Sequence, residues 1–374
     1  MRIGLDARAL VGRHTGDRTY WRGLIRGLSE IDPSNIYLLF TRSQPNEEDV
    51  LELPPNFELI ILPAFSERSW SLLDFSKALK RYRVDVAHTQ YTVSPFLPCR
   101  SVTTVHDISF RLFPDLFSWK DRVLLNMSVP SSMKRADAVI TVSESSRRDI
   151  LTAYPFIHPE KITATPLSVD HEFKPIEVGK QASARRHLAA NYGLTGEFVL
   201  SVGVLQPRKN LPLLIEAFTR AKRRGGLDIT LAIVGKIGWL SAETEDAILR
   251  AGTDVRMLGY VPDQDLPFLY GCANVMAYPS LYEGFGLPAL EAMACGCPVV
   301  VSNNSSLPEV VGEAGILLKA DNLTDWEETL IDLTENASKR SKMRLLGLDR
   351  AAQFSWSVTA QKTLEVYERI AKGK

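Results

Sequence analysis

Short runs of β-branched and other apolar residues alternate with helical patterns along the whole 374-residue sequence. Such an alternation is typical of parallel sheets that carry helices on both faces. The pattern stops at a polar stretch with proline and glycine, between "SVDHEFKPIEVGK" and "GEFVLSVG", and then starts again. Because the chain is longer than one hydrophobic core usually supports, the sequence predicts two doubly wound α/β domains, residues 1–174 and 175–355, which face each other across a cleft. The predicted strands are 2–7, 37–41, 58–63, 84–89, 101–107, 138–143 and 161–166 in the first half, and 198–203, 229–235, 255–260, 275–280, 298–302 and 315–319 in the second.

The charge balance and the lengths of the apolar segments argue against several classes of protein. Lys and Arg together number 44, as do Asp and Glu, so no net positive charge indicates a nucleic-acid partner. The opening "MRIGLDARAL" carries charges inside its apolar run, and no later segment has the roughly 18 uninterrupted apolar residues of a membrane-spanning helix. We therefore expect a cytoplasmic protein. The four cysteines lack the spacing and the nearby histidines of a zinc site.

A loop with two glycines and two nearby glutamates, in "SLYEGFGLPALEAMACGCPVVVS" (280–302), predicts a binding site at the start of a helix. The free amides and the dipole at a helix N-terminus favour anions and polar oxygens. Gly284 and Gly286 let the backbone approach a ligand closely. Glu283 or Glu291 alone would be interpreted as an ordinary loop or helix-end charge. Together with the glycines they favour a site for the hydroxyl groups of a ribose or a hexose.

Two adjacent cations follow a predicted strand in "SVGVLQPRKNLPLLIEAF" (201–218). The strand ends at Gly203, and Arg208 and Lys209 precede the next helix. Adjacent cations before a helix N-terminus make a stronger anion site than either feature alone, so the pattern predicts phosphate binding. The alternative is a solvated charged turn.

In the first half, "TTVHDISF" (103–110) places His106 and Asp107 at a strand end. A histidine and an aspartate at a strand end are often a structural pair, so the signal is weak alone; we retain it because the position faces the expected cleft. The first loop, "DARALVGRHTGDRTY", contains no G-x-G-x-x-G, which disfavours a nicotinamide-dependent dehydrogenase.

Taken together, these segments resemble the retaining glycosyltransferases of family 4, which have the GT-B architecture of two Rossmann-like domains. The likeness covers nearly the whole sequence, including "VTTVHDISF", "ADAVITVSESSRRDI", "LGYVPDQDLPFLYGCANVMAYPS" and the terminal "FSWSVTAQKTLEVYERI". It implies that the C-terminal helix, within residues 356–374, packs back on the first domain.

The resemblance also implies roles for single residues. Arg208 and Lys209 would hold the diphosphate of a nucleotide-sugar donor. Glu283 would contact the transferred sugar, and His106 would lie beside its anomeric carbon. Glu291 would accept the ribose hydroxyls. The other donor-binding positions implied by the resemblance are Gly16, Gly203, Gly259, Tyr260, Val261, Gly284, Phe285, Gly286 and Leu287.

Two positions depart from the pattern of the family. Many relatives have "TGIGRY" in the first loop, where this chain has "TGDRTY", so that Asp17 adds a negative charge near the expected diphosphate. Some relatives also carry an arginine directly after the glycine of the phosphate strand, where this chain has Val204.

The resemblance implies transfer of a hexosyl group, with retention and without a metal or other cofactor, to a glycan or lipid-linked acceptor. The "PRKN" and "YEGFGLP" segments look most like mannosyltransferases that use GDP-mannose, although UDP-glucose- and dTDP-rhamnose-dependent relatives share them. A nucleotide-sugar epimerase and a non-catalytic nucleotide-sugar binder are the alternatives. The mixture of aromatic and basic residues in 68–83 is typical of a solvated helix with an apolar underside, and peripheral membrane contact is the alternative interpretation.

Overall fold

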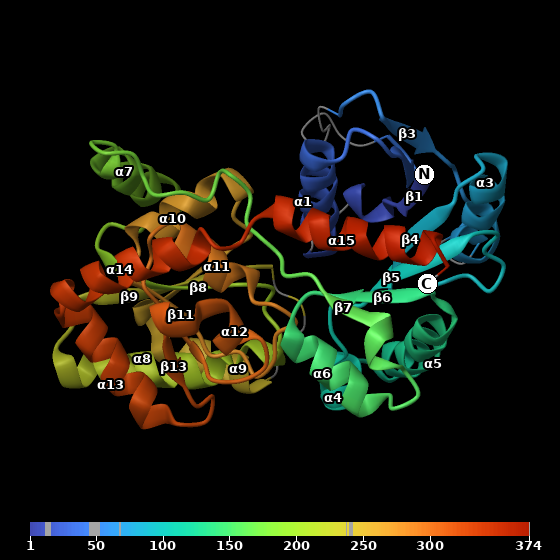
Figure 1. Cartoon of the computed structure of the whole chain (residues 1–374). Helices are drawn as coiled ribbons and strands as arrows, with labels where there is room; N and C mark the ends of the chain where they lie inside the picture. The colour runs from blue at the N-terminus through green and yellow to red at the C-terminus, as the bar shows by residue number, and fades with distance from the viewer. Residues whose placement is uncertain (12–15, 45–52, 67–68, 237, 239–241, 374) are drawn as a thin grey trace. The chain divides into compact units, whose positions relative to one another are not determined.

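The computed structural model describes residues 1–11, 16–44, 53–66, 69–236, 238 and 242–373. Its contacts divide the chain into two compact units (Figure 1). Unit 1 holds Met1–Ser168 together with Ser355–Lys374, and unit 2 holds Val169–Phe354. The units thus divide after Ser168, whereas the sequence pattern places the boundary after residue 174.

Unit 1 is built on a sheet whose described strands have the order β3-β2-β1-β4-β5-β6-β7, with all neighbours parallel. The strand order reverses between β1 and β4, and ligands of such sheets bind beyond the carboxyl ends of the strands at this point. The strands are β1 (Arg2–Asp6), β2 (Ile36–Thr41), β3 (Phe57–Ile61), β4 (Val86–Gln90), β5 (Arg100–Thr104), β6 (Ala138–Thr141) and β7 (Ile162–Ala164). The α-helices are α1 (Gly16–Ile31), α3 (Phe75–Arg81), α4 (Ser109–Leu112), α5 (Trp119–Arg135), α6 (Glu144–Ala153) and α15 (Trp356–Ala371).

The C-terminal helix α15 belongs to unit 1, where it packs on α1 (Figure 1). Two glycines of α1, one turn apart, permit this close approach. A Cβ on Gly23 would lie 2.0 Å from the ring of Trp356, and one on Gly27 would lie 2.3 Å from the main-chain oxygen of Trp356. A larger residue at either position would push the helices apart, because these distances are shorter than any van der Waals contact.

Unit 2 repeats the architecture with the strand order β10-β9-β8-β11-β12-β13, again with parallel neighbours among the described residues. Here the order reverses between β8 and β11, so the loops after these two strands lie next to each other. The strands are β8 (Glu197–Val202), β9 (Ile229–Val234), β10 (Val255–Gly259), β11 (Val275–Tyr278), β12 (Val299–Ser302) and β13 (Ile316–Leu318). The α-helices are α7 (Gln181–Tyr192), α8 (Leu211–Gly225), α9 (Ala242–Ala251), α10 (Leu266–Cys272), α11 (Leu287–Ala294), α12 (Leu307–Val311), α13 (Leu323–Glu335) and α14 (Ala337–Ala351).

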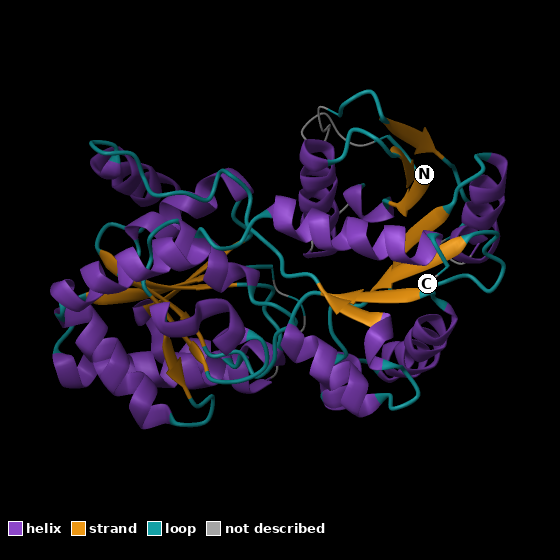
Figure 2. Cartoon of the chain, in the orientation of Figure 1, coloured by secondary structure: helices purple, strands orange, loops and turns teal. Residues whose placement is uncertain are grey.

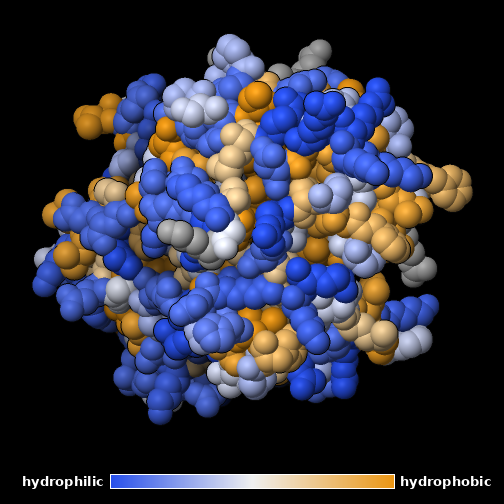
Figure 3. Space-filling view, turned by 45° about the vertical axis from the view of Figure 1, so that its right-hand side comes forward, coloured by the Kyte–Doolittle hydropathy of each residue, from blue (hydrophilic) through white to orange (hydrophobic). Residues whose placement is uncertain are grey.

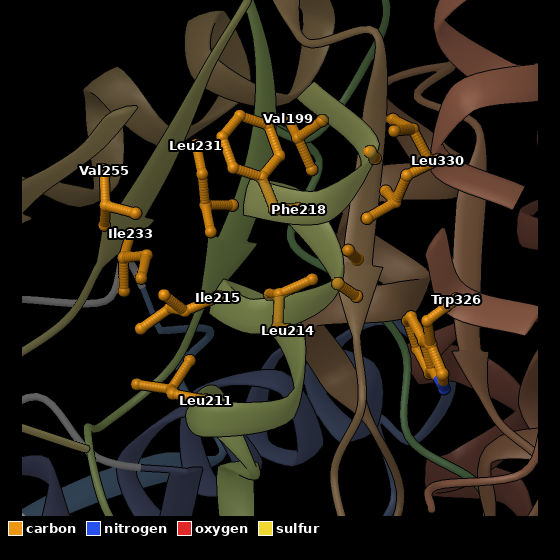
Figure 4. Packing of buried hydrophobic residues seen from close by; sticks show 14 of the residues in the cluster. Val199, Leu211, Leu214, Ile215, Phe218, Leu231, Ile233, Val255, Trp326 and Leu330 are labelled. Atoms are coloured by element: carbon orange, nitrogen blue, oxygen red, sulfur yellow. The ribbon is translucent and has the colours of Figure 1, made fainter. Parts of the chain in front are cut away.

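Helices lie on both faces of each sheet (Figure 2), and the core of unit 2 explains the position of α8. Leu211, Leu214, Ile215 and Phe218 recur at the spacing of one helix face and are buried against β8, β9 and α13 (Figure 4). Burying one such side chain stabilises the fold by about 1.5–3 kcal/mol. This packing fixes the N-terminus of α8 directly after the segment that carries Arg208 and Lys209. The prediction of two doubly wound parallel sheets is confirmed.

Candidate active site

Arg208, Lys209 and Glu283 meet in unit 2, at the point where the strand order reverses. The two cations lie in a short turn after β8 (Pro207–Lys209), and Glu283 lies in the loop between β11 and α11. Lys209 Nζ is 2.7 Å from Glu283 Oε1, and Arg208 Nη1 is 2.8 Å from Glu283 Oε2. Each carboxylate oxygen therefore accepts a hydrogen bond from a different cation.

The surroundings hold this cluster in place. Lys209 also donates to the Tyr278 hydroxyl at 2.5 Å, and Arg208 donates to the Tyr282 carbonyl at 2.6 Å. The main chains of the two loops are joined where the Leu281 amide donates to the Arg208 carbonyl at 2.8 Å. Multiple bonds of this kind restrict the long cationic side chains to one orientation.

The cluster keeps a net positive charge. Burial alone raises the pKa of Glu283, but the charges of Arg208 and Lys209 outweigh this effect and bring the pKa to about 2. The carboxylate is therefore ionised at neutral pH, and two cations and one anion leave one positive charge in excess. An excess cation in a buried setting favours an anionic ligand such as a phosphate.

Gly203 makes room for the lysine. Its φ is +149°, and a Cβ at this position would lie 3.0 Å from Lys209 Cε. The neighbouring strands also have glycines with positive φ at their ends, Gly235 directly after β9 and Gly259 at the end of β10. Only a glycine fits at position 235, because a Cβ there would lie 1.9 Å from the Gly203 carbonyl oxygen. The Gly235 amide in turn donates to the Gly259 carbonyl at 2.8 Å. The carboxyl ends of β8, β9 and β10 thus approach one another through backbone alone.

The predicted loop from Gly284 to Leu287 leads into α11, which begins at Leu287. Gly286 has a φ of +105°, the left-handed region that favours glycine. The side chain of Phe285 is buried, so this residue is available to a ligand only through its backbone. Two serines after β12, which the sequence analysis did not single out, hold the loop. Ser305 Oγ accepts from the Glu283 amide at 3.0 Å. Ser306 Oγ lies 2.9 and 2.7 Å from the Glu283 and Phe285 carbonyl oxygens, which share its single hydrogen.

Glu291 is partly buried on α11, where the hydroxyl of Tyr270 on α10 donates to its Oε2 at 2.8 Å. Burial raises the pKa of Glu291 to about 7, while the hydrogen bond from Tyr270 acts in the opposite direction. Tyr270 is not among the predicted site residues, since a tyrosine inside a helical pattern is normally a core residue.

The predicted base-lining segment follows β10. Gly259 ends the strand with a φ of +68°, Tyr260 is exposed, and Val261 is buried. Lys236, from the loop after β9, lies with Nζ 4.3 Å from the centre of the Tyr260 ring. Of the segment, only Tyr260 offers an exposed side chain to a ligand.

In unit 1, His106 follows the end of β5 and contacts Asp17 of α1 and Gln90 of β4. The neighbouring Asp107 accepts a hydrogen bond from the amide of Ser109, the first residue of α4, at 2.8 Å. Gly16 begins α1 and is exposed. His106 and Gly16 thus belong to unit 1, whereas Arg208, Lys209 and Glu283 belong to unit 2.

The segment 68–83, whose aromatic and basic residues gave membrane contact as an alternative interpretation, presents its aromatic residues to the core. Among its described residues, Trp70 is fully buried and stacks on Phe75, which is also buried. These two aromatic side chains cannot contact a membrane, because they are buried in the hydrophobic core of unit 1. No helix in the described part of the chain is long and apolar enough to cross a bilayer. Figure 3 shows hydrophobic residues interspersed with hydrophilic ones on one face.

The fold and the cluster in unit 2 define a two-domain GT-B glycosyltransferase. Sequence models of two families match, Glycosyl transferases group 1 over residues 189–345 and Glycosyltransferase Family 4 over residues 16–173. The chain is 34% identical over 297 residues to the O-antigen chain mannosyltransferase B of Escherichia coli, covering 78% of this chain and 76% of that protein. The chain belongs to glycosyltransferase family 4, as the resemblance in its sequence predicted.

Two further comparisons show a similar sequence and a similar fold. The serotype-specific mannosyltransferase WbdA of Escherichia coli is 30% identical over 298 residues, which cover 75% of this chain but only 35% of the longer protein. Among solved structures, Anabaena HepE in complex with UDP-glucose matches the fold with a TM-score of 0.73 at 18% identity, covering 98% of this chain and 99% of that one.

Proposed function

We propose that this glycosyltransferase moves a mannosyl group from GDP-mannose to a hydroxyl of a glycan or lipid-linked acceptor, in the synthesis of a cell-surface polysaccharide or glycoconjugate. The observation that carries the proposal is the buried cluster of Arg208, Lys209 and Glu283, whose excess cation suits the diphosphate of a nucleotide sugar. The name of the Escherichia coli relative favours mannose as the transferred sugar.

In the proposed reaction, the acceptor oxygen bonds to the anomeric carbon on the face from which the diphosphate leaves, so the configuration is retained. The bond between the anomeric carbon and the phosphate oxygen breaks, and that oxygen takes the acceptor proton. Negative charge grows on the leaving diphosphate, where Arg208, Lys209 and the amides at the start of α11 stabilise it. The sugar ring becomes cation-like, and the Glu283 carboxylate offsets this charge. No step requires a metal ion.

A thermal-shift comparison tests the donor. A ligand that binds only the folded state raises the melting temperature by mass action. We expect GDP-mannose to raise it more than UDP-glucose or dTDP-rhamnose at equal concentration, and transfer to continue in excess chelator. A larger increase in melting temperature with UDP-glucose or dTDP-rhamnose would identify that nucleotide sugar as the donor instead of GDP-mannose. Conversion of the donor without any acceptor would favour the epimerase, and binding without turnover over a broad acceptor panel would favour the non-catalytic binder.

Glu291 predicts a pH dependence of donor binding. As an ionised carboxylate it accepts ribose hydroxyls, and its raised pKa of about 7 means that this form is lost as the pH falls through neutrality. We expect the affinity for the nucleoside diphosphate to fall by up to about tenfold per pH unit below 7. Without ligand the sign is reversed: since folding raises this pKa from 4.5, the contribution of Glu291 to the free energy of unfolding is full below pH 4.5 and is lost as the pH rises through 7.

Titration calorimetry from pH 5.5 to 8.5 measures the affinity. In Glu291→Gln we expect weaker binding without this pH dependence. In Tyr270→Phe we expect the midpoint to move above 7, because the hydrogen bond that stabilises the carboxylate is gone. A wild-type affinity that stays constant between pH 6 and 8 would contradict the role of Glu291.

We also infer that contact with an anionic membrane surface involves α5. Trp119, Val123 and Met127 lie one turn apart on the first half of this helix and are all exposed, on a different side from the buried Val129 and Met133. A helix packs on its own domain through one apolar side. Since α5 has a second apolar side that is exposed, we expect this side to contact an external partner. The exposed cations Lys120 and Arg122 flank this stripe, which suits the negative headgroups of a bilayer.

Vesicle flotation tests this surface. We expect the protein to float with phosphatidylglycerol vesicles, and the double variant Trp119→Ser/Met127→Ser to bind them at least about tenfold more weakly, because two large apolar side chains are lost. The matched control is Leu345→Ser/Leu346→Ser on α14, where both leucines are also exposed. Equal flotation of wild type and the α5 variant, or none by either, would dismiss the membrane contact.

A further inference from the structure

Two residues from separate elements of unit 1 contact one ring nitrogen of His106. Nε2 of His106 lies 3.1 Å from the side-chain nitrogen of Gln90, at the end of β4. The same Nε2 lies 3.4 Å from Asp17 Oδ1, in the first turn of α1. The side-chain nitrogen of Gln90 is in turn 3.4 Å from the main-chain carbonyl oxygen of Asp17. The convergence lies beyond the carboxyl ends of β4 and β5, beside the reversal in strand order.

The main-chain carbonyl of Asp17 fixes the direction of the hydrogen bonds. A carbonyl oxygen only accepts, so the side of the Gln90 amide that faces it must be the NH2 group. That group has two hydrogens, one directed to the Asp17 carbonyl and the other to His106 Nε2. Turning the amide over would place its oxygen against the Asp17 carbonyl oxygen, which is repulsive. Nε2 of His106 therefore accepts a hydrogen bond, and the single hydrogen of the neutral ring resides on Nδ1.

We propose that Gln90 is a positioning residue that holds His106 as the neutral Nδ1–H tautomer, so that His106 acts in sugar transfer as a hydrogen-bond donor and not as a base. This inference rests on the proposed function, in which His106 lies beside the transferred sugar. No hydrogen-bond partner of Nδ1 occurs among the residues that the structure describes. In the proposed role, the Nδ1–H group donates to an oxygen atom of the substrate.

The packing around His106 keeps the ring in this orientation. The ring of Tyr20 meets it edge to face, with the centres 5.0 Å apart. The Tyr20 hydroxyl is held by Thr104 Oγ1 at 2.8 Å, and the same oxygen is 2.7 Å from Nε2 of the buried His88. Gln90 is held by β4, where it pairs in register with Thr104 of β5. The sheet thus holds both Gln90, which donates to Nε2, and Tyr20, which packs against the His106 ring.

The competing arrangement is an imidazolium paired with the Asp17 carboxylate. It would direct an Nε2–H group toward the NH2 group of Gln90, two donors facing each other. Burial also disfavours the charged ring, and it lowers the pKa of His106 although Asp17 and Asp107 act to raise it. His88, the other titratable ring nearby, has its own pKa lowered to about 3 by burial and by His106, so it adds no charge at neutral pH. Asp17, where the family pattern has an uncharged residue, thus acts on the tautomer through its main-chain carbonyl, which orients the Gln90 amide, and not through its carboxylate.

Nuclear magnetic resonance of the full chain labelled with ¹⁵N-histidine tests the tautomer without any substrate. Long-range ¹H–¹⁵N correlation distinguishes a protonated from a bare ring nitrogen, and the signal that disappears in His106→Gln assigns the residue. At pH 7.5 we expect His106 with Nδ1 protonated and Nε2 bare. An Nε2–H tautomer, or an imidazolium, would overturn the proposal.

Two variants extend the test. In Gln90→Glu the new carboxylate accepts, so Nε2 gains a hydrogen, and we expect kcat to fall about tenfold or more while the KM for the nucleotide sugar is unchanged. Asp17→Asn keeps the main-chain carbonyl and should retain the wild-type tautomer. A wild-type kcat and tautomer in Gln90→Glu, or a changed tautomer in Asp17→Asn, would refute the role of Gln90. If the tautomer is as expected but no nucleotide sugar is turned over, the proposed function fails instead.

Discussion

Replacing Lys209 with alanine is expected to lower kcat/KM by about a hundredfold to a thousandfold, or about 2.7–4 kcal/mol of transition-state stabilisation. The buried Lys209 ammonium lies 2.7 Å from Glu283 and belongs to the group that we propose to face the departing diphosphate. Its charge matters most when the sugar–phosphate bond breaks, so the loss should appear mainly in kcat. Steady-state kinetics with a verified donor measure it.

The matched control for this variant is Lys222→Ala. Lys222 also lies in unit 2 and forms an ion pair, with Asp254 at 2.8 Å, but it is located in the last turn of α8, away from the cluster. We expect near-normal kinetics for the control. If Lys209→Ala turns over at the wild-type rate, or if Lys222→Ala loses as much activity, the diphosphate assignment is wrong.

Glu283→Gln is expected to have two opposite effects: kcat falls by about a hundredfold or more, and binding of the nucleoside diphosphate becomes tighter. Each carboxylate oxygen of Glu283 accepts from one cation, whereas a glutamine offers only one oxygen. One of the two cations then faces the side-chain NH2 group in place of a carboxylate oxygen, and the loss of the balancing charge costs about 3–5 kcal/mol of stability. A bound diphosphate supplies the missing negative charge, but nothing replaces the carboxylate beside the sugar.

Titration calorimetry with GDP and thermal unfolding with and without GDP measure these effects. Because folding lowers the pKa of Glu283 from 4.5 to about 2, its contribution to stability is present above pH 4.5 and is lost as the pH falls through 2. The difference in stability between wild type and variant should therefore persist at pH 7 and shrink in acid. The control is Glu327→Gln, which removes the carboxylate of the Arg224–Glu327 ion pair in the same unit. Weaker GDP binding in Glu283→Gln than in this control would contradict the competition between carboxylate and diphosphate.

The sequence predicted the strands of both sheets, because burial between two layers of helices imposes apolar runs that are visible in the chain itself. The exact ends were less accurate: the predicted strand 101–107 stops at Thr104, so that His106 lies in the loop beyond it. Strand ends depend on where hydrogen-bonded neighbours stop, and this information lies in other parts of the chain. The same limit applies to Trp70 and Phe75. Their segment contains aromatic and basic residues together, but its sequence does not tell which side of the helix the core covers.

Arg208, Lys209, Glu283 and the loop glycines were predicted as donor residues because they follow strand ends, where parallel sheets bind ligands. Gly16, Gly259, Tyr260 and Val261 were predicted from the family resemblance alone. The groups that hold them were not found. Tyr270, Ser305, Ser306 and Gln90 are ordinary residues in their own segments, and each becomes significant only through a hydrogen bond to a distant residue.

By itself, then, the sequence determined two parallel α/β sheets and the segments that carry polar side chains at their edges, because periodicity and turn chemistry are local properties of a chain. The tertiary structure alone decided that Lys209 and Arg208 share the carboxylate of Glu283, 74 and 75 residues away, and that the side-chain nitrogen of Gln90 lies 3.1 Å from Nε2 of His106. The physical reason is that such contacts depend on strand order and side-chain packing, which bring distant residues within about 3 Å of each other.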